Sequence, residues 1–199
     1  MRGLSGNSQK TGSGEEIEET NDSMSSVQSR HRLLKELKSA GLLGSSAGTV
    51  GGAETDDTTV LRLGLLEDDL HEWLAVLSGP EDSPYSGGQF RVRLSVPSSY
   101  PLAAPKATFV TPIFHPNVHF RTGEVCMDIL KTDWSPAWTL MSVCRAIVAL
   151  MSDPAGGADS PLNCDAGNLA RGGDLRAFNG LARMYTVDLA MDHRQRPEV

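Results

Sequence analysis

The sequence contains few cysteines, and no two of them stand close together. Cys126, Cys144 and Cys164 are odd in number and form no CxxC pair, which argues against a disulfide scaffold and against a zinc site. We therefore expect free thiols in a reducing compartment and no bound metal.

Long apolar runs and a surplus of basic residues are also missing. No apolar stretch approaches the ~20 residues that cross a bilayer, and no secretory signal peptide is recognisable, so we expect no direct insertion into a membrane. The formal charge of −7 argues against a nucleic-acid partner, because proteins that bind phosphate backbones usually carry a basic surplus. Protein or small-molecule partners and a cytoplasmic location are favoured.

The length of 199 residues suits one domain with tails, and a domain of ~150 residues can bury around two thirds of its unfolded surface. Residues 1–28 are polar and acidic and too poor in large apolar side chains to offset the entropy of ordering, which predicts a disordered tail. We expect one folded domain over 29–191, a mobile Gly- and Ser-rich insert over about 41–58, and a C-terminal tail over 192–199.

An amphipathic first helix is predicted over about 27–40. Leu33, Leu34 and Leu37 recur at helical spacing on one face. The opposite face is basic, with Arg30, Arg32, Lys35 and Lys38. Taken alone, such a charged face is explained by solvation.

The remaining pattern predicts an α+β order of helix, strands and then helices. Alternating hydrophobicity and intervening Gly- and Pro-rich turns favour an antiparallel meander of four strands, near 60–63, 72–77, 90–96 and 106–110. Prolines before the last strand predict that it lies at a sheet edge. Helical periodicity and capping residues favour three later helices, over 139–151, 165–170 and 174–191.

One short stretch contains the candidate chemistry. The turn His115-Pro116-Asn117 is followed nine residues after its Asn by Cys126, and the Gly123-Glu124 turn lets the chain fold back towards Asn117. A thiol within reach of an amide donor suits acyl transfer from a thioester, because the tetrahedral intermediate carries an oxyanion.

Other interpretations of these residues are open at this point. His115-Pro116-Asn117 could be only a capped turn. A Cys-His protease with His115 as base is disfavoured, since the adjacent Pro restricts that residue and an imidazole there is as readily used to hold the turn. Cys144 is expected to pack as a small hydrophobe. Asp159 and Ser160 are polar candidates that could equally cap a helix.

Assembled in order, these segments resemble the ubiquitin-conjugating enzymes over roughly Gln28 to Ala190. The motifs that carry the resemblance are Arg32–Leu37, Trp73, Gly79-Pro80 with Ser83-Pro84-Tyr85, Tyr100-Pro101, His115-Pro116-Asn117, Cys126–Leu130, Trp134-Ser135-Pro136 and Ser160-Pro161-Leu162. Within that family, Trp138, Asp159–Leu162 and the segment from Asp165 to Asp174 are similar to the peroxisomal ubiquitin-conjugating enzymes. The resemblance implies the family's α+β fold: an N-terminal helix, a four-stranded antiparallel meander and C-terminal helices.

The resemblance also implies a mechanism. Cys126 is expected to accept ubiquitin as a thioester from an activating enzyme that consumes the ATP, and to pass it to a lysine or cysteine, with no cofactor on this chain. Asn117 is expected to hold the active-site loop or the oxyanion, with His115 and Pro116 as structural support. Ser160 and Asp159 are expected to orient or deprotonate the incoming nucleophile.

Partner surfaces follow from the same resemblance. Arg32 and Lys35 are expected to dock the activating enzyme, which replaces the interpretation as solvation alone. A RING-type ligase is expected on Leu102, Pro136 and Ala137, and a donor ubiquitin on Ser142, Arg145 and Ala149. The peroxisomal likeness implies a peroxisomal membrane tether, recruitment to the cytosolic face of peroxisomes, and the import receptor as substrate. A conjugating enzyme of another pathway or ubiquitin-like modifier, and a non-catalytic ubiquitin-binding adaptor, are the alternatives.

Overall fold

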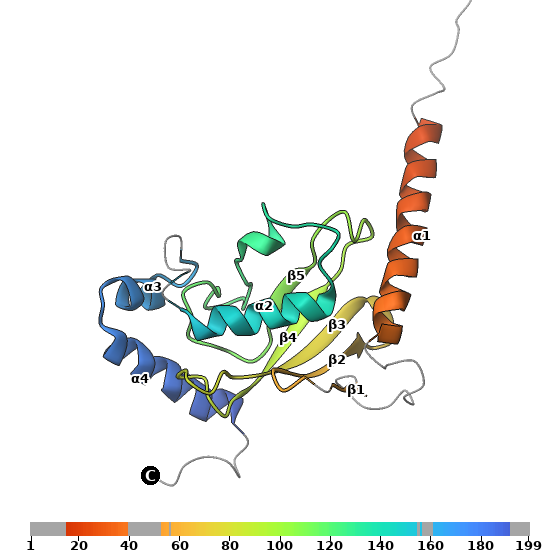
Figure 1. The fold of residues 1–199 in the computed structure, drawn as a ribbon. Helices are drawn as coiled ribbons and strands as arrows, with labels where there is room; N and C mark the ends of the chain where they lie inside the picture. The colour runs from red at the N-terminus through yellow and green to blue at the C-terminus, as the bar shows by residue number, and fades with distance from the viewer. Residues whose placement is uncertain (1–14, 40–52, 56, 155, 157–160, 192–199) are drawn as a thin grey trace, which may run out of the picture.

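The computed structural model describes residues 15–39, 53–55, 57–154, 156 and 161–191. In chain order the elements are α1 (Glu15–Ser39), β1 (Ala53–Glu54), β2 (Val60–Leu66), β3 (Asp69–Ser78), β4 (Gln89–Ser95), β5 (Lys106–Phe109), η1 (Asp128–Leu130), α2 (Leu140–Ser152), α3 (Cys164–Arg171), α4 (Leu175–Tyr185) and η2 (Thr186–Ala190). Figure 1 shows α2 lying across the sheet, with α1 at one end of it and α3 and α4 at the other.

The sheet is an antiparallel meander in which every strand pairs with the next one along the chain. Strands β2 to β5 confirm the four predicted strands, and β5 lies at an edge, as the prolines before it indicate. The short strand β1 was not predicted. It pairs with β2 at Leu63 and Arg62, so Ala53 and Glu54, which were expected within the insert, lie at the edge of the sheet.

Strand β4 shows how the sequence pattern produces the core. Phe90, Val92 and Leu94 are buried and alternate with exposed Arg91 and Arg93, because successive side chains of a strand point to opposite faces. These side chains share one core with the apolar side of α2, which lies against β2 and β3 and contributes Leu140, Val143, Ile147, Val148 and Met151. This layer fixes the sheet and α2 relative to each other, and the candidate site lies beside α2.

Helix α1 is longer than the predicted first helix. It begins at Glu15, so residues 15–28, which were expected in the tail, lie in this helix. Four glutamates among residues 15–19 favour a helix start there, since negative charge is stabilising near a helix N-terminus. Leu33 and Leu37 are buried in the core, but Leu34, expected on the same face, is 40% exposed because only a narrow stripe of α1 meets the sheet.

The three later helices are confirmed, with the last one continuing from α4 into the π-helical segment η2. Several expectations lie outside the described residues: the tail before 15, the part of the insert up to residue 52, Asp159 and Ser160, and the C-terminal tail. Within the described part of the chain, no helix is long and apolar enough to span a bilayer.

Candidate active site

His115 anchors the turn that carries Asn117. Its imidazole is fully buried; Nδ1 accepts a hydrogen bond from the Asn117 backbone N at 3.1 Å, and Nε2 donates to the Leu150 carbonyl at 3.2 Å. Burial lowers the pKa of His115 to about 4, because a charged ring is disfavoured away from water. The ring is therefore neutral, with both nitrogens engaged, and has no free nitrogen to act as a base on Cys126.

Cys126 is fixed to the same turn through its backbone. Its N donates to the Asn117 carbonyl at 2.8 Å, and Asn117 Nδ2 donates to the Cys126 carbonyl at 3.3 Å. Gly123 makes the return path possible: its φ is +73°, and a Cβ there would lie 2.2 Å from the Phe109 carbonyl oxygen. Only glycine adopts this conformation without strain. The reversal predicted at Gly123-Glu124 thus brings Asn117 and Cys126 together.

The Asn117 amide is positioned for more than one contact. The residue is only 8% exposed, and its Oδ1 has no hydrogen-bond partner among the described residues. A primary amide carries two N–H donors, and the Cys126 carbonyl takes one of them. Among the contacts of the described residues, the second N–H of this amide has no acceptor.

Cys126 opens into a groove of about 630 Å³ between its own loop and α2. The described lining residues are Asn117, Cys126, Met127, Asp128, Ile129, Asp133, Ala146, Ala149, Leu150, Asp153 and Gly156. Of the three thiols, Cys126 is half-buried at this groove, Cys144 is buried and Cys164 is exposed. Burial, followed by the charge of Asp57, raises the pKa of Cys144 to about 12, so this thiol is not a nucleophile at neutral pH.

Lys131 is a site residue that sequence reasoning missed. Its Nζ donates to Cys126 Sγ at 2.9 Å, and this hydrogen bond is the largest cause that raises the pKa of Lys131. A spacing of five residues matches neither the helical nor the strand periodicity, so no regular pattern predicts this contact. The contact depends on the single turn of η1, whose start at Asp128 could have suggested that the chain curls back over the thiol.

The expected ligase-facing residues lie on two loops that the structure ties together. Leu102 is 69% exposed, and Pro136 and Ala137 are exposed on the second loop. Between them, Trp134 Nε1 donates to the Pro101 carbonyl at 2.9 Å. These three apolar residues can therefore meet one partner at the same time.

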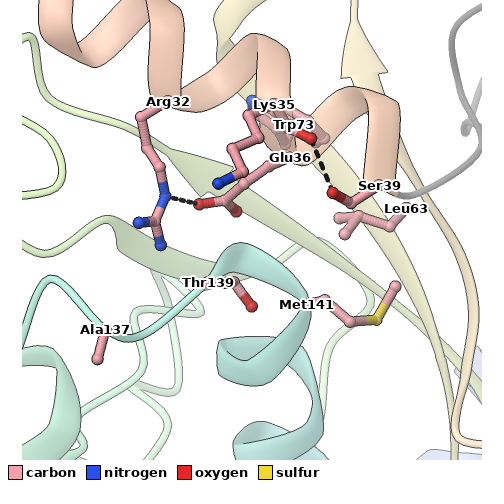
Figure 2. A pocket seen from close by; sticks show the side chains of 9 residues that line it. All are labelled: Arg32, Lys35, Glu36, Ser39, Leu63, Trp73, Ala137, Thr139 and Met141. Atoms are coloured by element: carbon pink, nitrogen blue, oxygen red, sulfur yellow. Dashed lines mark hydrogen bonds and ion pairs between the residues drawn. The ribbon is translucent and has the colours of Figure 1, made fainter.

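The two residues expected to dock an activating enzyme have different environments. They line a pocket of about 330 Å³ between α1 and the start of α2, together with Glu36, Trp73 and Met141 (Figure 2). Lys35 is exposed. Arg32 is instead engaged inside the fold: its Nε donates to Glu36 at 2.6 Å and its guanidinium to the Trp138 carbonyl at 2.9 Å. Its availability to a partner is correspondingly reduced.

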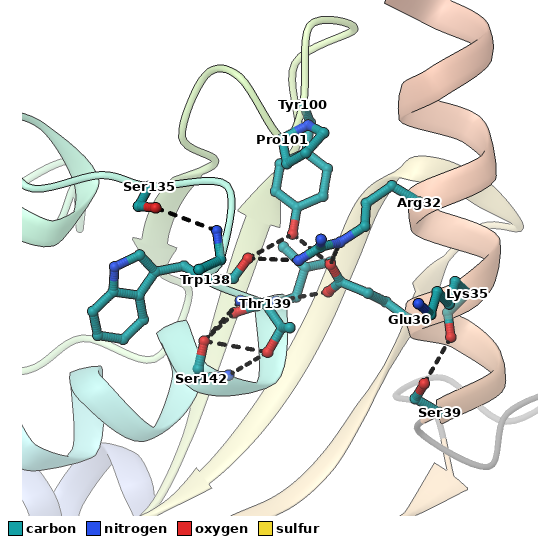
Figure 3. Close-up of polar contacts among 12 residues, drawn as sticks. Arg32, Lys35, Glu36, Ser39, Tyr100, Pro101, Ser135, Trp138, Thr139 and Ser142 are labelled. Atoms are coloured by element: carbon teal, nitrogen blue, oxygen red, sulfur yellow. Dashed lines mark hydrogen bonds and ion pairs between the residues drawn. The ribbon is translucent and has the colours of Figure 1, made fainter.

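Glu36, which sequence reasoning passed over, is the centre of this network (Figure 3). One carboxylate oxygen accepts from Arg32 and from the Tyr100 hydroxyl, each at 2.6 Å. The other accepts from the Leu140 backbone N at 2.8 Å, at the first turn of α2. Burial and this carboxylate raise the pKa of Tyr100, so its hydroxyl remains a donor. Glu36 therefore joins α1 to Tyr100, two residues before Leu102, and to the start of α2.

The expected donor-ubiquitin residues on α2 are not equally free. The Ser142 hydroxyl accepts from Thr139 N at 2.8 Å as part of the helix cap. Arg145 Nε donates to Asp57 at 2.6 Å, and hydrogen bonds, the largest from Thr59, lower the pKa of Asp57. Ala149 lines the groove beside Cys126. Ala149 and Arg145 are exposed, whereas Ser142 is half-buried.

Comparison with known proteins identifies this arrangement. The family model described as "Ubiquitin-conjugating enzyme" matches residues 49–186, well over half of the chain. The chain belongs to the ubiquitin-conjugating enzyme family. It is therefore a ubiquitin-conjugating enzyme with Cys126 and Asn117 in the matched region.

Similar members of the ubiquitin-conjugating enzyme family have peroxin names. The chain is 58% identical over 125 residues to Protein PEROXIN-4 of Arabidopsis thaliana, covering 63% of this chain and 78% of that protein. It is 59% identical over 120 residues to ubiquitin-conjugating enzyme E2 pex4 of Dictyostelium discoideum, covering 60% and 79%. A crystal structure of H. polymorpha Pex4p in complex with the soluble domain of Pex22p matches with a TM-score of 0.71 and 34% identity, covering 82% and 99%.

Proposed function

We propose that Cys126 carries ubiquitin as a thioester and passes it to a lysine or cysteine of a substrate. The observation that carries this proposal is a half-buried thiol at the mouth of a groove, backed by an immobilised amide. The Cys126 sulfur attacks the thioester carbonyl on the activating enzyme, a new C–S bond forms, and the old thiol leaves. ATP is consumed upstream by that enzyme, and no cofactor is needed on this chain.

Discharge repeats the exchange with a different nucleophile. The acceptor amine or thiol attacks the carbonyl carbon, the C–S bond to Cys126 breaks, and the proton of the acceptor is lost to solvent or to a polar neighbour. Asn117 stabilises the oxyanion with its second N–H. Ser160 and Asp159 are proposed to orient the acceptor. His115 supports the turn and takes no part in proton transfer, because both of its nitrogens are engaged.

Lys35 is proposed to contact the activating enzyme, with Arg32 contributing mainly through its hold on the Trp138 carbonyl. Leu102, Pro136 and Ala137 are proposed to meet a RING-type ligase, because all three are exposed on loops that one hydrogen bond joins. Donor ubiquitin is proposed to lie over Ala149 and the exposed part of Arg145, close to the groove that takes its C-terminal tail.

The peroxin names of the relatives support a peroxisomal role. We propose that this enzyme acts at the cytosolic face of peroxisomes on the import receptor, and that a partner corresponding to Pex22p tethers it there. The surface proposed for the tether is the outer side of α4 and η2, where Leu181, Met184 and Leu189 are exposed. Met184→Glu should abolish binding to the partner's soluble domain while thioester formation continues; binding that persists would contradict this surface.

A charging assay tests the proposed activity. The purified chain is incubated with ATP and either ubiquitin or another ubiquitin-like modifier, each with its own activating enzyme. We expect an adduct with ubiquitin that reducing agent removes. An adduct only with a different modifier would contradict ubiquitin as the cargo, and binding of the tether without any adduct would favour a non-catalytic adaptor.

A further inference from the structure

We infer that Asp57 is a positioning residue for discharge of the thioester: it fixes the Arg145 guanidinium on the outer face of α2, where the guanidinium contacts the donor ubiquitin carried by Cys126. This inference rests on the proposed thioester at Cys126 and on the proposed donor surface over Arg145 and Ala149. It deepens both by naming the residue that prepares this surface before ubiquitin is attached.

The outer face of α2 carries a single charge. Arg145 is the only charged residue of this helix, and Met141 and Ala149, four residues before and after it, lie on the same face. Ala149 also lines the groove at Cys126. The guanidinium at position 145 therefore belongs to an otherwise uncharged helical surface that continues into this groove.

An ion pair with a distant part of the chain holds the Arg145 side chain. Its Nε donates to Asp57 Oδ2 at 2.6 Å, across 88 residues of sequence. The two partners differ in exposure, because 60% of the Arg145 side chain is exposed but only 16% of the Asp57 side chain. The carboxylate is therefore the inner member of the pair, and the guanidinium is the outer member that a partner can reach.

Asp57 is held in place without the help of Arg145. Its other oxygen, Oδ1, accepts from Thr59 N at 2.8 Å, from Thr59 Oγ1 at 2.6 Å and from Val60 N at 3.2 Å. Val60 is itself buried in the core. The hydrogen bond from the Thr59 side chain is the largest cause that lowers the pKa of Asp57, so the carboxylate is ionised at neutral pH. What the ion pair adds is the orientation of Arg145.

The oriented guanidinium keeps donors for a partner. An arginine side chain has five N–H donors, and Asp57 accepts from the one on Nε. Among the described residues, the N–H groups of the two terminal nitrogens have no acceptor. They suit carbonyl or carboxylate oxygens on the surface of ubiquitin. A side chain that is already ordered loses less conformational entropy when the partner binds, which favours this contact.

This contact should speed discharge and leave charging unchanged. A ubiquitin attached through its C-terminus samples many orientations, and few of them align the thioester carbonyl for attack. Contact with Arg145 shifts the population towards orientations in which ubiquitin lies over α2 and its C-terminal tail lies in the groove. During charging, ubiquitin is instead held by the activating enzyme. Asp57 should therefore change the rate of discharge alone.

The test is single-turnover discharge of the full chain to free lysine. The enzyme is charged with ubiquitin, further activation is stopped by removing ATP, and the rate of thioester loss without lysine is subtracted. Asp57→Asn keeps an acceptor oxygen for Thr59 but removes the charge. Arg145→Lys keeps the charge but removes the guanidinium. Glu72→Gln is the matched control, because it breaks the pair with Arg93, whose Nε lies 2.7 Å from Glu72 Oε2 on the outer face of the sheet.

We expect every variant to form thioester as fast as wild type. Discharge should fall about three- to tenfold in Asp57→Asn, which loses the ordering of one long side chain. It should fall in the same range in Arg145→Lys, because an ammonium engaged by Asp57 has no second N–H fork to offer. Adding Asp57→Asn to Arg145→Ala should cause no further loss, since both act through one guanidinium. Glu72→Gln should discharge at the wild-type rate.

Three outcomes would overturn the inference: unchanged discharge in Asp57→Asn, an equal loss in Glu72→Gln, or normal discharge in Arg145→Lys, which would make the ion pair purely structural. Charging that falls in step with discharge in Asp57→Asn would also overturn it, as a general loss of folding. If thioester forms and discharge is normal in every variant, only the role of Asp57 is lost. If wild type forms no thioester, the proposed function of Cys126 fails with it, and the two failures are thereby distinguished.

Discussion

Replacing Glu36 by alanine removes one carboxylate on which three donors from three parts of the chain converge. The Tyr100 hydroxyl and the Leu140 backbone N come from nearly buried positions, and the Glu36 side chain is only 10% exposed. Hydrogen bonds to a charged group contribute about 1.5–3 kcal/mol each when one partner is removed. The Arg32 pair adds below about 1 kcal/mol, since its guanidinium is partly exposed.

The free energy of unfolding should therefore fall by roughly 4 kcal/mol in Glu36→Ala, allowing for the Trp138 carbonyl as a second, weaker acceptor for Tyr100 at 3.5 Å. For a domain of this size, such a loss lowers the melting temperature by roughly 8–16 °C. Glu36→Gln keeps one acceptor oxygen and should lose about half as much. Urea unfolding followed by tryptophan fluorescence measures both values.

Glu72→Ala is the matched control. Glu72 also accepts two side-chain hydrogen bonds, from Arg93 at 2.7 Å and Ser95 at 2.9 Å, but on the outer face of the sheet. An ion pair exposed to water contributes up to about 1 kcal/mol, so this variant should be nearly as stable as wild type. If Glu36→Ala lost no more stability than Glu72→Ala, the argument that Glu36 joins α1 to Tyr100 and to the start of α2 would be refuted.

Three further predictions concern individual side chains. The pKa of His115 is lowered to about 4 in the fold, so as pH falls from about 6.5 to 4 the unfolded chain binds a proton that the folded chain does not. Over this range the free energy of unfolding, measured by urea titration, should fall by about 3 kcal/mol more in wild type than in His115→Gln. An equal fall in the two proteins would contradict this. Iodoacetamide at pH 8 should alkylate Cys126 and Cys164 but spare Cys144 in the native state, and early labelling of Cys144 by mass spectrometry would argue against its burial. Asn117→Ala should charge nearly normally but discharge to free lysine more slowly, by a factor of about 100 or more, and normal single-turnover discharge would remove its role at the oxyanion.

Much of the fold was predictable because its signals are local. Alternation of Phe90, Val92 and Leu94 predicts β4, and helical spacing of Leu140, Val143 and Ile147 predicts α2. The return of the chain from Asn117 to Cys126 was also accessible, since the nine-residue spacing and the glycine turn limit how far the two can separate.

What was missed depends on contacts that no local pattern encodes. Glu36 meets Leu140 across 104 residues of sequence, so nothing near Glu36 indicates that its carboxylate faces inwards. Arg32 was expected to be free because its contact with the Trp138 carbonyl is equally distant in sequence. The contact of Lys131 with Cys126 depends on a single turn, which is too short to produce a periodic pattern.

The attachment site of ubiquitin tests the central claim most directly. The chain and its Cys126→Ala variant are incubated with ubiquitin, activating enzyme and ATP, and the adducts are resolved with and without reducing agent and then mapped by mass spectrometry. We expect wild type to form a reductant-sensitive adduct on Cys126 and the variant to form none. A reductant-sensitive adduct that persists in Cys126→Ala, or that maps to Cys144 or Cys164, would contradict the assignment of Cys126 as the ubiquitin carrier.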